Sequence, residues 1–148
     1  MSLENMIKRV PVKIKRLHPD AKIPVYGTEH AAGFDIYSIE DYELQPGETH
    51  AIRTGIALEI PKGKCLQIWD RSGMGVKAIH RFAGLGDSDY RNEYRIVLFN
   101  STKNIYKILK GDKITQAIIV DYYKAEFEEV NELSDTKRGD GLQHSTGK

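Results

Sequence analysis

The sequence predicts an all-β domain, a sandwich or barrel-like jelly roll, from three observations. Apolar and polar residues alternate with a period of two through most of the chain. Short segments of this kind are separated by PG, KG, AG and KGD turns. Only residues 72–79, SGMGVKAI, favour a helix, and their glycines limit it to a turn or two. We therefore expect short strands with one short helix.

Each expected strand follows from this alternation. The first has Val10, Val12 and Ile14 on one side, and the second carries one apolar parity from Ile52 to Ile60. The same alternation of apolar and polar residues continues in three later segments, at residues 65–69, 94–99 and 112–123. The pattern repeats no 20–50-residue unit, so a solenoid or propeller is not expected.

The length of 148 residues indicates one domain. Such a chain can bury roughly 70% of the surface that it exposes when unfolded. Apolar residues become scarce from about Glu132 onward. We therefore expect residues 1–131 to form the β-domain and residues 132–148 a mobile, glycine-rich arm of the same domain.

Composition excludes several classes of protein. The 22 Lys and Arg nearly balance the 21 Asp and Glu, which argues against a large duplex-DNA footprint. Cys65 is the only cysteine, so an internal disulfide and a cysteine zinc site are ruled out. No apolar stretch approaches 18 residues, and the first ten residues lack the long apolar run typical of a secretory signal. We expect a cytoplasmic protein without a membrane or a stable nucleic-acid partner.

Residues 84–93, GLGDSDYRNE, are one candidate site. Asp87 and Asp89 can be ordinary turn formers, because Asp accepts hydrogen bonds from nearby amides. Alternatively, Asp87 is a general base that deprotonates a water molecule. Tyr90 favours the second interpretation, since its ring offers a floor for a flat ligand.

The C-terminal residues 138–148, RGDGLQHSTGK, are a second candidate. They offer backbone N–H groups and hydroxyls but little apolar surface, so they order only around a polar ligand. Arg138 beside such amides favours phosphate. A carboxylate turn together with this tail indicates chemistry on a nucleotide.

Two further segments leave alternatives open. Arg71, Ser72 and Gly73 resemble an anion site at a helix N-terminus, or Ser72 is an N-cap and Arg71 a surface charge. Gln116 shares parity with Ile114, Ile118 and Val120, so it is either a satisfied core amide or a ligand contact. Asp35 begins a strand, where a supporting role is expected.

Five segments, in order and spacing, resemble the five motifs of the trimeric dUTP pyrophosphatase (dUTPase) family. They are residues 31–38, 70–77, 83–93, 111–119 and 138–147. The resemblance implies a β-clip or jelly-roll-like subunit in a threefold homotrimer, with active sites at subunit interfaces. It also implies hydrolysis of dUTP to dUMP and pyrophosphate, with Mg²⁺ held by the triphosphate. Such an activity keeps uracil out of DNA and supplies dUMP.

The resemblance also assigns roles to residues. It makes Asp87 the general base for a water that attacks the α-phosphorus. The hairpin with Leu85 and Gly86 would read the uracil edge, and Tyr90 would pack under the deoxyribose. The phosphate chain would be held by Arg71, Ser72, Gly73 and Gln116, with Arg138, Ser145 and Thr146 from the tail.

The sequence departs from the family pattern at several positions. Gln143 stands where the family has a phenylalanine that stacks over the base, which predicts a looser lid and a higher KM. Gly86 replaces an aliphatic residue, Asp70 a proline and Asn92 a glycine. The segment between Lys77 and Gly84 is also shorter than in many members of the family.

Other readings stay open. A dCTP deaminase shares the fold and would need an acid near the hairpin, for which Glu93 is the candidate. A second alternative is a non-catalytic, regulatory trimer that binds a nucleotide or a protein. A purely structural jelly roll would leave the Arg138 tail unexplained.

Overall fold

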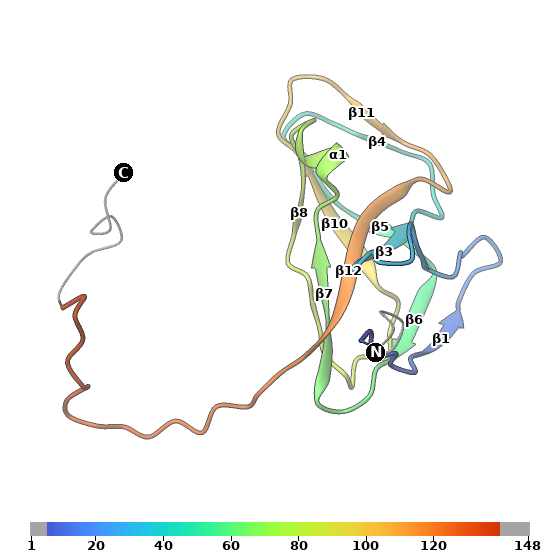
Figure 1. The fold of residues 1–148 in the computed structure, drawn as a ribbon. Helices are drawn as coiled ribbons and strands as arrows, with labels where there is room; N and C mark the ends of the chain where they lie inside the picture. The colour runs from blue at the N-terminus through green and yellow to red at the C-terminus, as the bar shows by residue number, and fades with distance from the viewer. Residues whose placement is uncertain (1–5, 140–148) are drawn as a thin grey trace.

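The structure is a computed structural model that describes residues 6–139, and it is nearly all β (Figure 1). One short helix, α1 (Ser72–Gly75), interrupts the strands where a turn or two of helix was expected. The strands are β1 (Lys13–Arg16), β2 (Val25–Tyr26), β3 (Phe34–Tyr37), β4 (Tyr42–Leu44), β5 (Thr49–Arg53), β6 (Ile56–Glu59), β7 (Lys64–Trp69), β8 (Ile79–Phe82), β9 (Leu85–Gly86), β10 (Arg95–Asn100), β11 (Tyr106–Ile108) and β12 (Lys113–Asp121).

The described strands form four antiparallel sheets around one apolar interior. The largest has the order β2-β3-β12-β7-β9, and a second has the order β5-β10-β8. The pairs β1-β6 and β11-β4 complete the body (Figure 1). Fully buried aliphatic side chains from every one of these sheets form the core, including Ile36, Leu44, Ile52, Leu66 and Leu98. The β1-β6 pair adds Ile56 and Leu58, which are also buried. The predicted all-β class is confirmed.

The alternation from Ile52 to Ile60 is correct in parity but spans two strands rather than one. Ile52, Thr54 and Ile56 are all at least 99% buried, as alternation predicts. The chain nevertheless leaves the β5-β10 pair at Arg53 and joins β1 from Ile56 onward. One apolar parity therefore supplies two different sheets.

The expected face of Gln116 is partly wrong. The register of β12 against β3 shifts between Lys113 and Thr115, and Ile114, Thr115 and Ala117 are all buried. This β-bulge reverses the parity, so Gln116 no longer shares the face of Ile114. A period-two count cannot detect an inserted residue.

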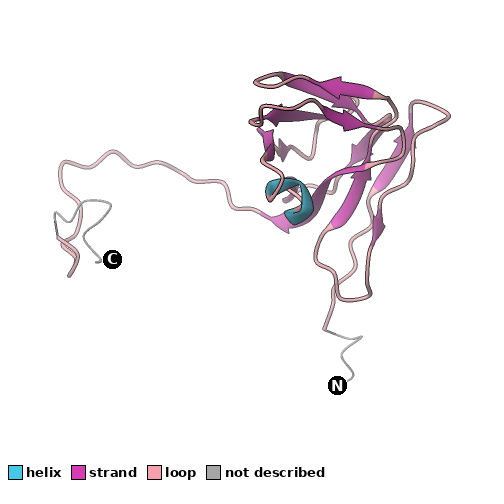
Figure 2. Cartoon of the chain, turned by 90° about the horizontal axis from the view of Figure 1, so that it is seen from above, coloured by secondary structure: helices cyan, strands magenta, loops and turns pink. Residues whose placement is uncertain are grey.

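Beyond β12 the chain leaves the body (Figures 1 and 2). Every residue from Asp121 to Gly139 is exposed, with Tyr123 at 99% and Phe127 at 96%. We call residues 122–139 the C-terminal segment. The boundary expected at residue 132 stays a prediction. In the described part of the chain, no helix is long and apolar enough to cross a membrane.

Candidate active site

The first half of the site is a gap between β9 and β10, which are not paired with each other. Strand β8 pairs with β10 as far as Phe82 opposite Val97. Ala83 and Gly84 then take positive φ angles of 61° and 137°, and β9 pairs with β7 instead. A Cβ at Gly84 would lie 3.0 Å from the Ile68 carbonyl oxygen, so glycine suits both the φ angle and the close approach. Strands β9 and β10, the two arms of one hairpin, are thereby held apart.

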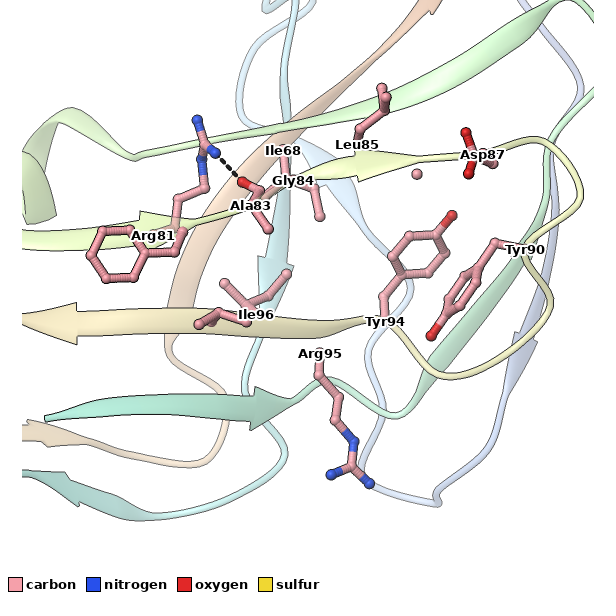
Figure 3. Close-up of a pocket in the computed structure, with 13 residues that line it drawn as sticks. Ile68, Arg81, Ala83, Gly84, Leu85, Asp87, Tyr90, Tyr94, Arg95 and Ile96 are labelled. Atoms are coloured by element: carbon pink, nitrogen blue, oxygen red, sulfur yellow. Dashed lines mark hydrogen bonds between the residues drawn. The ribbon is translucent and has the colours of Figure 1, made fainter.

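The gap encloses a hollow of about 190 Å³, which we call the hairpin hollow (Figure 3). It is lined by Ile68, residues 81–87, Tyr90 and residues 94–97. Leu85, Gly86, Asp87 and Tyr90, four of the predicted site residues, therefore lie together. Asp87 and Leu85 are exposed, whereas Gly86 is buried, as alternation along β9 requires.

Tyr90 is held in place by its neighbours. Its backbone N–H donates to the Asp87 carbonyl at 3.2 Å, and its hydroxyl donates to the Glu93 carbonyl at 3.0 Å. Its ring meets the Tyr94 ring edge to face, with centroids 5.1 Å apart. Asp87 is therefore both a turn former and an exposed carboxylate at the hollow.

Glu93, just before β10, connects this hairpin to the end of β5 and to Gly55. Its carboxylate accepts from Arg53 Nε at 3.3 Å, from the Gly55 backbone N–H at 2.9 Å and from Arg95 Nε at 3.2 Å. Burial alone would raise the pKa of Glu93, but the Arg53 and Gly55 hydrogen bonds and both guanidinium charges outweigh it and lower the pKa. Glu93 is thus an ionised structural anchor.

Tyr94 fills the space beneath Gly86. A Cβ at Gly86 would lie only 2.7 Å from the Tyr94 hydroxyl oxygen, so this packing requires glycine. Burial, then the neighbouring Tyr90 and Asp87, raises the pKa of Tyr94 to about 12. The hydroxyl has no hydrogen-bond partner among the described residues.

The second half of the site is a charged group that we call the Arg71 cluster, formed by Asp35, Arg71, Lys113 and Gln116. The Asp35 carboxylate forms one ion pair with Arg71 Nε at 3.2 Å and a second with Lys113 Nζ at 3.1 Å. Arg71 Nη1 also donates to the Lys113 carbonyl at 3.2 Å. Two cations share one carboxylate, so the group carries excess positive charge.

Gln116 belongs to this cluster through its neighbour Asp70. Its amide nitrogen donates to the Asp70 carbonyl at 2.7 Å, and Gln116 is opposite Asp35 in the β3-β12 register. The amide is therefore satisfied and only half-buried. It joins the segments that precede α1 and begin β12.

The alternative in which Ser72 caps the helix is wrong. The N-cap of α1 is Arg71, with φ −82° and ψ 135°, and no side chain caps it. Ser72 and Gly73 are exposed at the first turn. Arg71 and Gly73 also line a second hollow of about 420 Å³ with Lys77 and Lys113.

Within one chain, the Gly86 end of the hairpin hollow and Arg71 are at different places along β7. Gly86 is opposite Leu66 on β7, whereas Arg71 follows Leu66 by five residues. This separation is roughly 16 Å along an extended strand. Arg138 lies on the exposed C-terminal segment, which leaves the body beyond β12 (Figure 1). Gln143, Ser145 and Thr146 lie outside the described residues.

Sequence reasoning missed Lys113 and Tyr94 as parts of the site. Lys113 could have been suggested by its place directly after the KGD turn, beside a predicted anion site. Tyr94 was read only as the start of a strand. The signal that could have found Tyr94 is Gly86, which replaces an aliphatic residue of the family pattern. The loss of that side chain indicates that a large neighbouring side chain fills its space.

The described residues bring no three His, Cys, Asp or Glu side chains together as a metal cage. Asp87 nevertheless stands exposed at the hairpin hollow. Mg²⁺ commonly takes most of its ligands from substrate phosphates and water rather than from a cage of protein side chains.

Comparison with known proteins now adds to this geometry. The family model described as dUTPase matches residues 19–147. A deoxyuridine 5′-triphosphate nucleotidohydrolase of Nautilia profundicola is 46% identical over 93% of this chain and 99% of its own. One of Clostridioides difficile is 42% identical over 92% and 97%.

Solved structures agree. The dUTPase of Staphylococcus bacteriophage 80alpha, as a G164S mutant with dUpNHpp, matches with a TM-score of 0.86 and 26% identity. The match covers 93% of this chain and 98% of the phage chain. The expected subunit fold, with its single short helix, is confirmed, and the chain belongs to the dUTPase family.

Proposed function

We propose that this protein is a dUTP nucleotidohydrolase that converts dUTP and water to dUMP and pyrophosphate. Its relatives in two bacteria carry that name, and a phage relative was solved with the substrate analogue dUpNHpp. The observation that carries the proposal is the hairpin hollow, which places a free carboxylate, Asp87, beside an aromatic ring, Tyr90, and exposed backbone.

In this proposal the base and sugar occupy the hairpin hollow. The backbone of Leu85 and Gly86 pairs with the uracil edge, because β9 and β10 are not paired with each other there. The Tyr90 ring packs under the deoxyribose and disfavours a 2′-hydroxyl. Rigid backbone donors and acceptors discriminate strongly, since a wrong base leaves buried polar groups unpaired.

Asp87 acts as the general base. A water molecule gives a proton to its carboxylate while the water oxygen bonds to the α-phosphorus. The bond from the α-phosphorus to the bridging oxygen breaks in line, and pyrophosphate leaves with that electron pair. The protein's main task is to position these groups and to neutralise charge.

Arg71, Ser72, Gly73 and Gln116 hold the phosphate chain. The Arg71 cluster has two cations for one carboxylate, which favours a polyanion. Asp35 has a supporting role, since it orients Arg71. Mg²⁺ bound to the triphosphate would neutralise phosphate charge and align the leaving group.

We further propose that the active enzyme is a homotrimer with sites shared between copies. Gly86, beside Asp87, is opposite Leu66, five residues before Arg71, so a triphosphate attacked beside Asp87 of one copy would be held by another copy's arginine. The C-terminal segment exposes Tyr123, Phe127 and Leu133 almost fully, as expected of a segment that packs on a neighbour. Arg138, with Ser145 and Thr146, would then close a neighbouring site.

The deaminase alternative loses support from the hairpin. Its candidate acid, Glu93, is engaged by two arginines and a backbone amide and is held ionised. A general acid or base needs a pKa near the working pH and access to the substrate. No specific observation favours the regulatory alternative.

The test is pyrophosphate release from dUTP with Mg²⁺, compared with dCTP, dTTP and UTP. Asp87→Asn should lower kcat on the order of 10³-fold, the contribution typical of a general base. Asp89→Asn, two residues away on the same turn, is the matched control and should retain activity. Equal loss in both variants, or ammonia release from dCTP, would contradict the proposal.

A further inference from the structure

The hairpin hollow contains a hydrogen-bonding group that the proposed mechanism does not use. Tyr94 is 95% buried, since only 5% of its surface is exposed, and its hydroxyl lacks a partner among the described residues. Buried hydroxyls are normally paired, so an orphan needs an explanation. The nearby Tyr90 hydroxyl, by contrast, already donates to the Glu93 carbonyl.

One other buried side-chain atom is unpaired in the described part of the chain, Arg81 Nε. It has a simpler explanation, because the Asp70 carboxylate lies 4.0 Å away and offsets its charge. Its guanidinium also donates to the Ala83 carbonyl. Besides burial, the neighbouring Tyr90 and Asp87 raise the pKa of Tyr94, but no described residue forms a hydrogen bond with its hydroxyl.

The position of Tyr94 is set by its surroundings. The ring extends from the residue before β10 toward β9 and ends below the strand between Leu85 and Asp87 (Figure 3). Its backbone N–H donates to the Ile56 carbonyl at 2.9 Å, and Thr54 donates to its carbonyl. Any side chain at Gly86 would collide with the phenol. Because residue 86 has no side chain, the buried hydroxyl packs directly against the Gly86 backbone.

We propose that Tyr94 is a further specificity-determining residue, whose hydroxyl donates a hydrogen bond to a carbonyl oxygen of the pyrimidine ring bound in the hairpin hollow. This inference rests on the proposed function, which places the base there. A 2,4-dione ring such as uracil presents two carbonyl acceptors. The phenol stays protonated at neutral pH, because burial raises its pKa to about 12, so it remains a donor.

The test compares Tyr94→Phe with the wild-type full chain. The variant keeps the ring and removes only the hydroxyl. We expect the Kd for dUMP, measured by calorimetry, to rise on the order of 3- to 10-fold, the loss of one neutral hydrogen bond. The Tm of the ligand-free protein should stay the same or rise, because an unpaired buried hydroxyl is removed.

Tyr42→Phe is the matched control. Tyr42 lies on β4, outside the hollow, and its hydroxyl donates to Glu48. Its removal should lower Tm and leave the Kd for dUMP unchanged. This is the opposite signature to that expected for Tyr94→Phe.

An unchanged Kd for dUMP in Tyr94→Phe would overturn the inference, since the hydroxyl would then be a buried group without a ligand. Pyrophosphate release by the wild type, measured in parallel, reports on the proposed function separately. If the wild type binds dUMP but hydrolyses no dUTP, the function fails and the Tyr94 comparison still decides the inference. Failure of the wild type to bind dUMP would overturn both.

Discussion

The hairpin hollow and the C-terminal segment represent opposite ways of building a site. Glu93, Tyr90 and Tyr94 hold the hollow through contacts within one chain, and Gly84 and Gly86 fit their places closely. Residues 122–139 have almost no such contacts and are exposed throughout. In the proposed enzyme, one copy therefore preforms a pocket for the base, whereas another copy closes that pocket over the triphosphate.

A change in the exposed C-terminal segment should affect activity and not stability. Arg138→Ala should lower kcat/KM for dUTP on the order of 100-fold, because one charge-assisted contact to the phosphates is lost. Tm should not change, since Arg138 is exposed and no ion pair is found for it in the described structure. Lys137→Ala, the adjacent cation, should be near wild type in both measurements. Equal effects of the two variants would indicate a general charge effect and remove the contrast between the regions.

A change in the residues that hold the hairpin hollow should instead lower the stability of the fold. Glu93→Gln should lower the free energy of unfolding at pH 7 by about 2 kcal/mol, as charged hydrogen bonds to Arg53 and Arg95 weaken. The folded-state pKa of Glu93 is depressed, so its contribution exists above the unfolded pKa of about 4.3. That contribution is lost as the pH falls through the lower folded pKa.

Urea unfolding at pH 7 and below pH 4 measures this difference, which should shrink in acid. Glu59→Gln, which removes an exposed carboxylate paired with Lys13, should change stability little at either pH. A constant Glu93→Gln effect across this range would contradict the assignment of Glu93 as an ionised anchor.

A smaller effect is expected between the two regions, in the Arg71 cluster. Asp35→Asn should raise the KM for dUTP roughly 10-fold with little change in kcat, because Arg71 and Lys113 lose the carboxylate that orients them. Asp121→Asn, at the far end of β12 and paired with Lys64, is the control and should leave KM unchanged. A selective fall in kcat would show instead that Asp35 acts on the chemical step.

Much of this arrangement could be predicted from the sequence. The period-two pattern predicted the strands, and the glycine-flanked GLGDSDY turn marked the hollow, because both are local properties of the chain. The bulge in β12 could not be predicted, since it reverses the face of Gln116 without any change in composition. The pairing of Gly86 with Tyr94 depends on two residues that approach across strands, which a linear pattern does not reveal.

The central claim is that one copy supplies Asp87 and another supplies Arg71. Mixing tests it directly: Asp87→Asn and Arg71→Ala chains, each inactive alone, are unfolded together in equal amounts and refolded. Random assembly should restore about a quarter of wild-type pyrophosphate release, because about a quarter of the shared sites receive both intact residues. Activity that stays at the level of the separate variants would contradict the claim and place both residues in the site of a single chain.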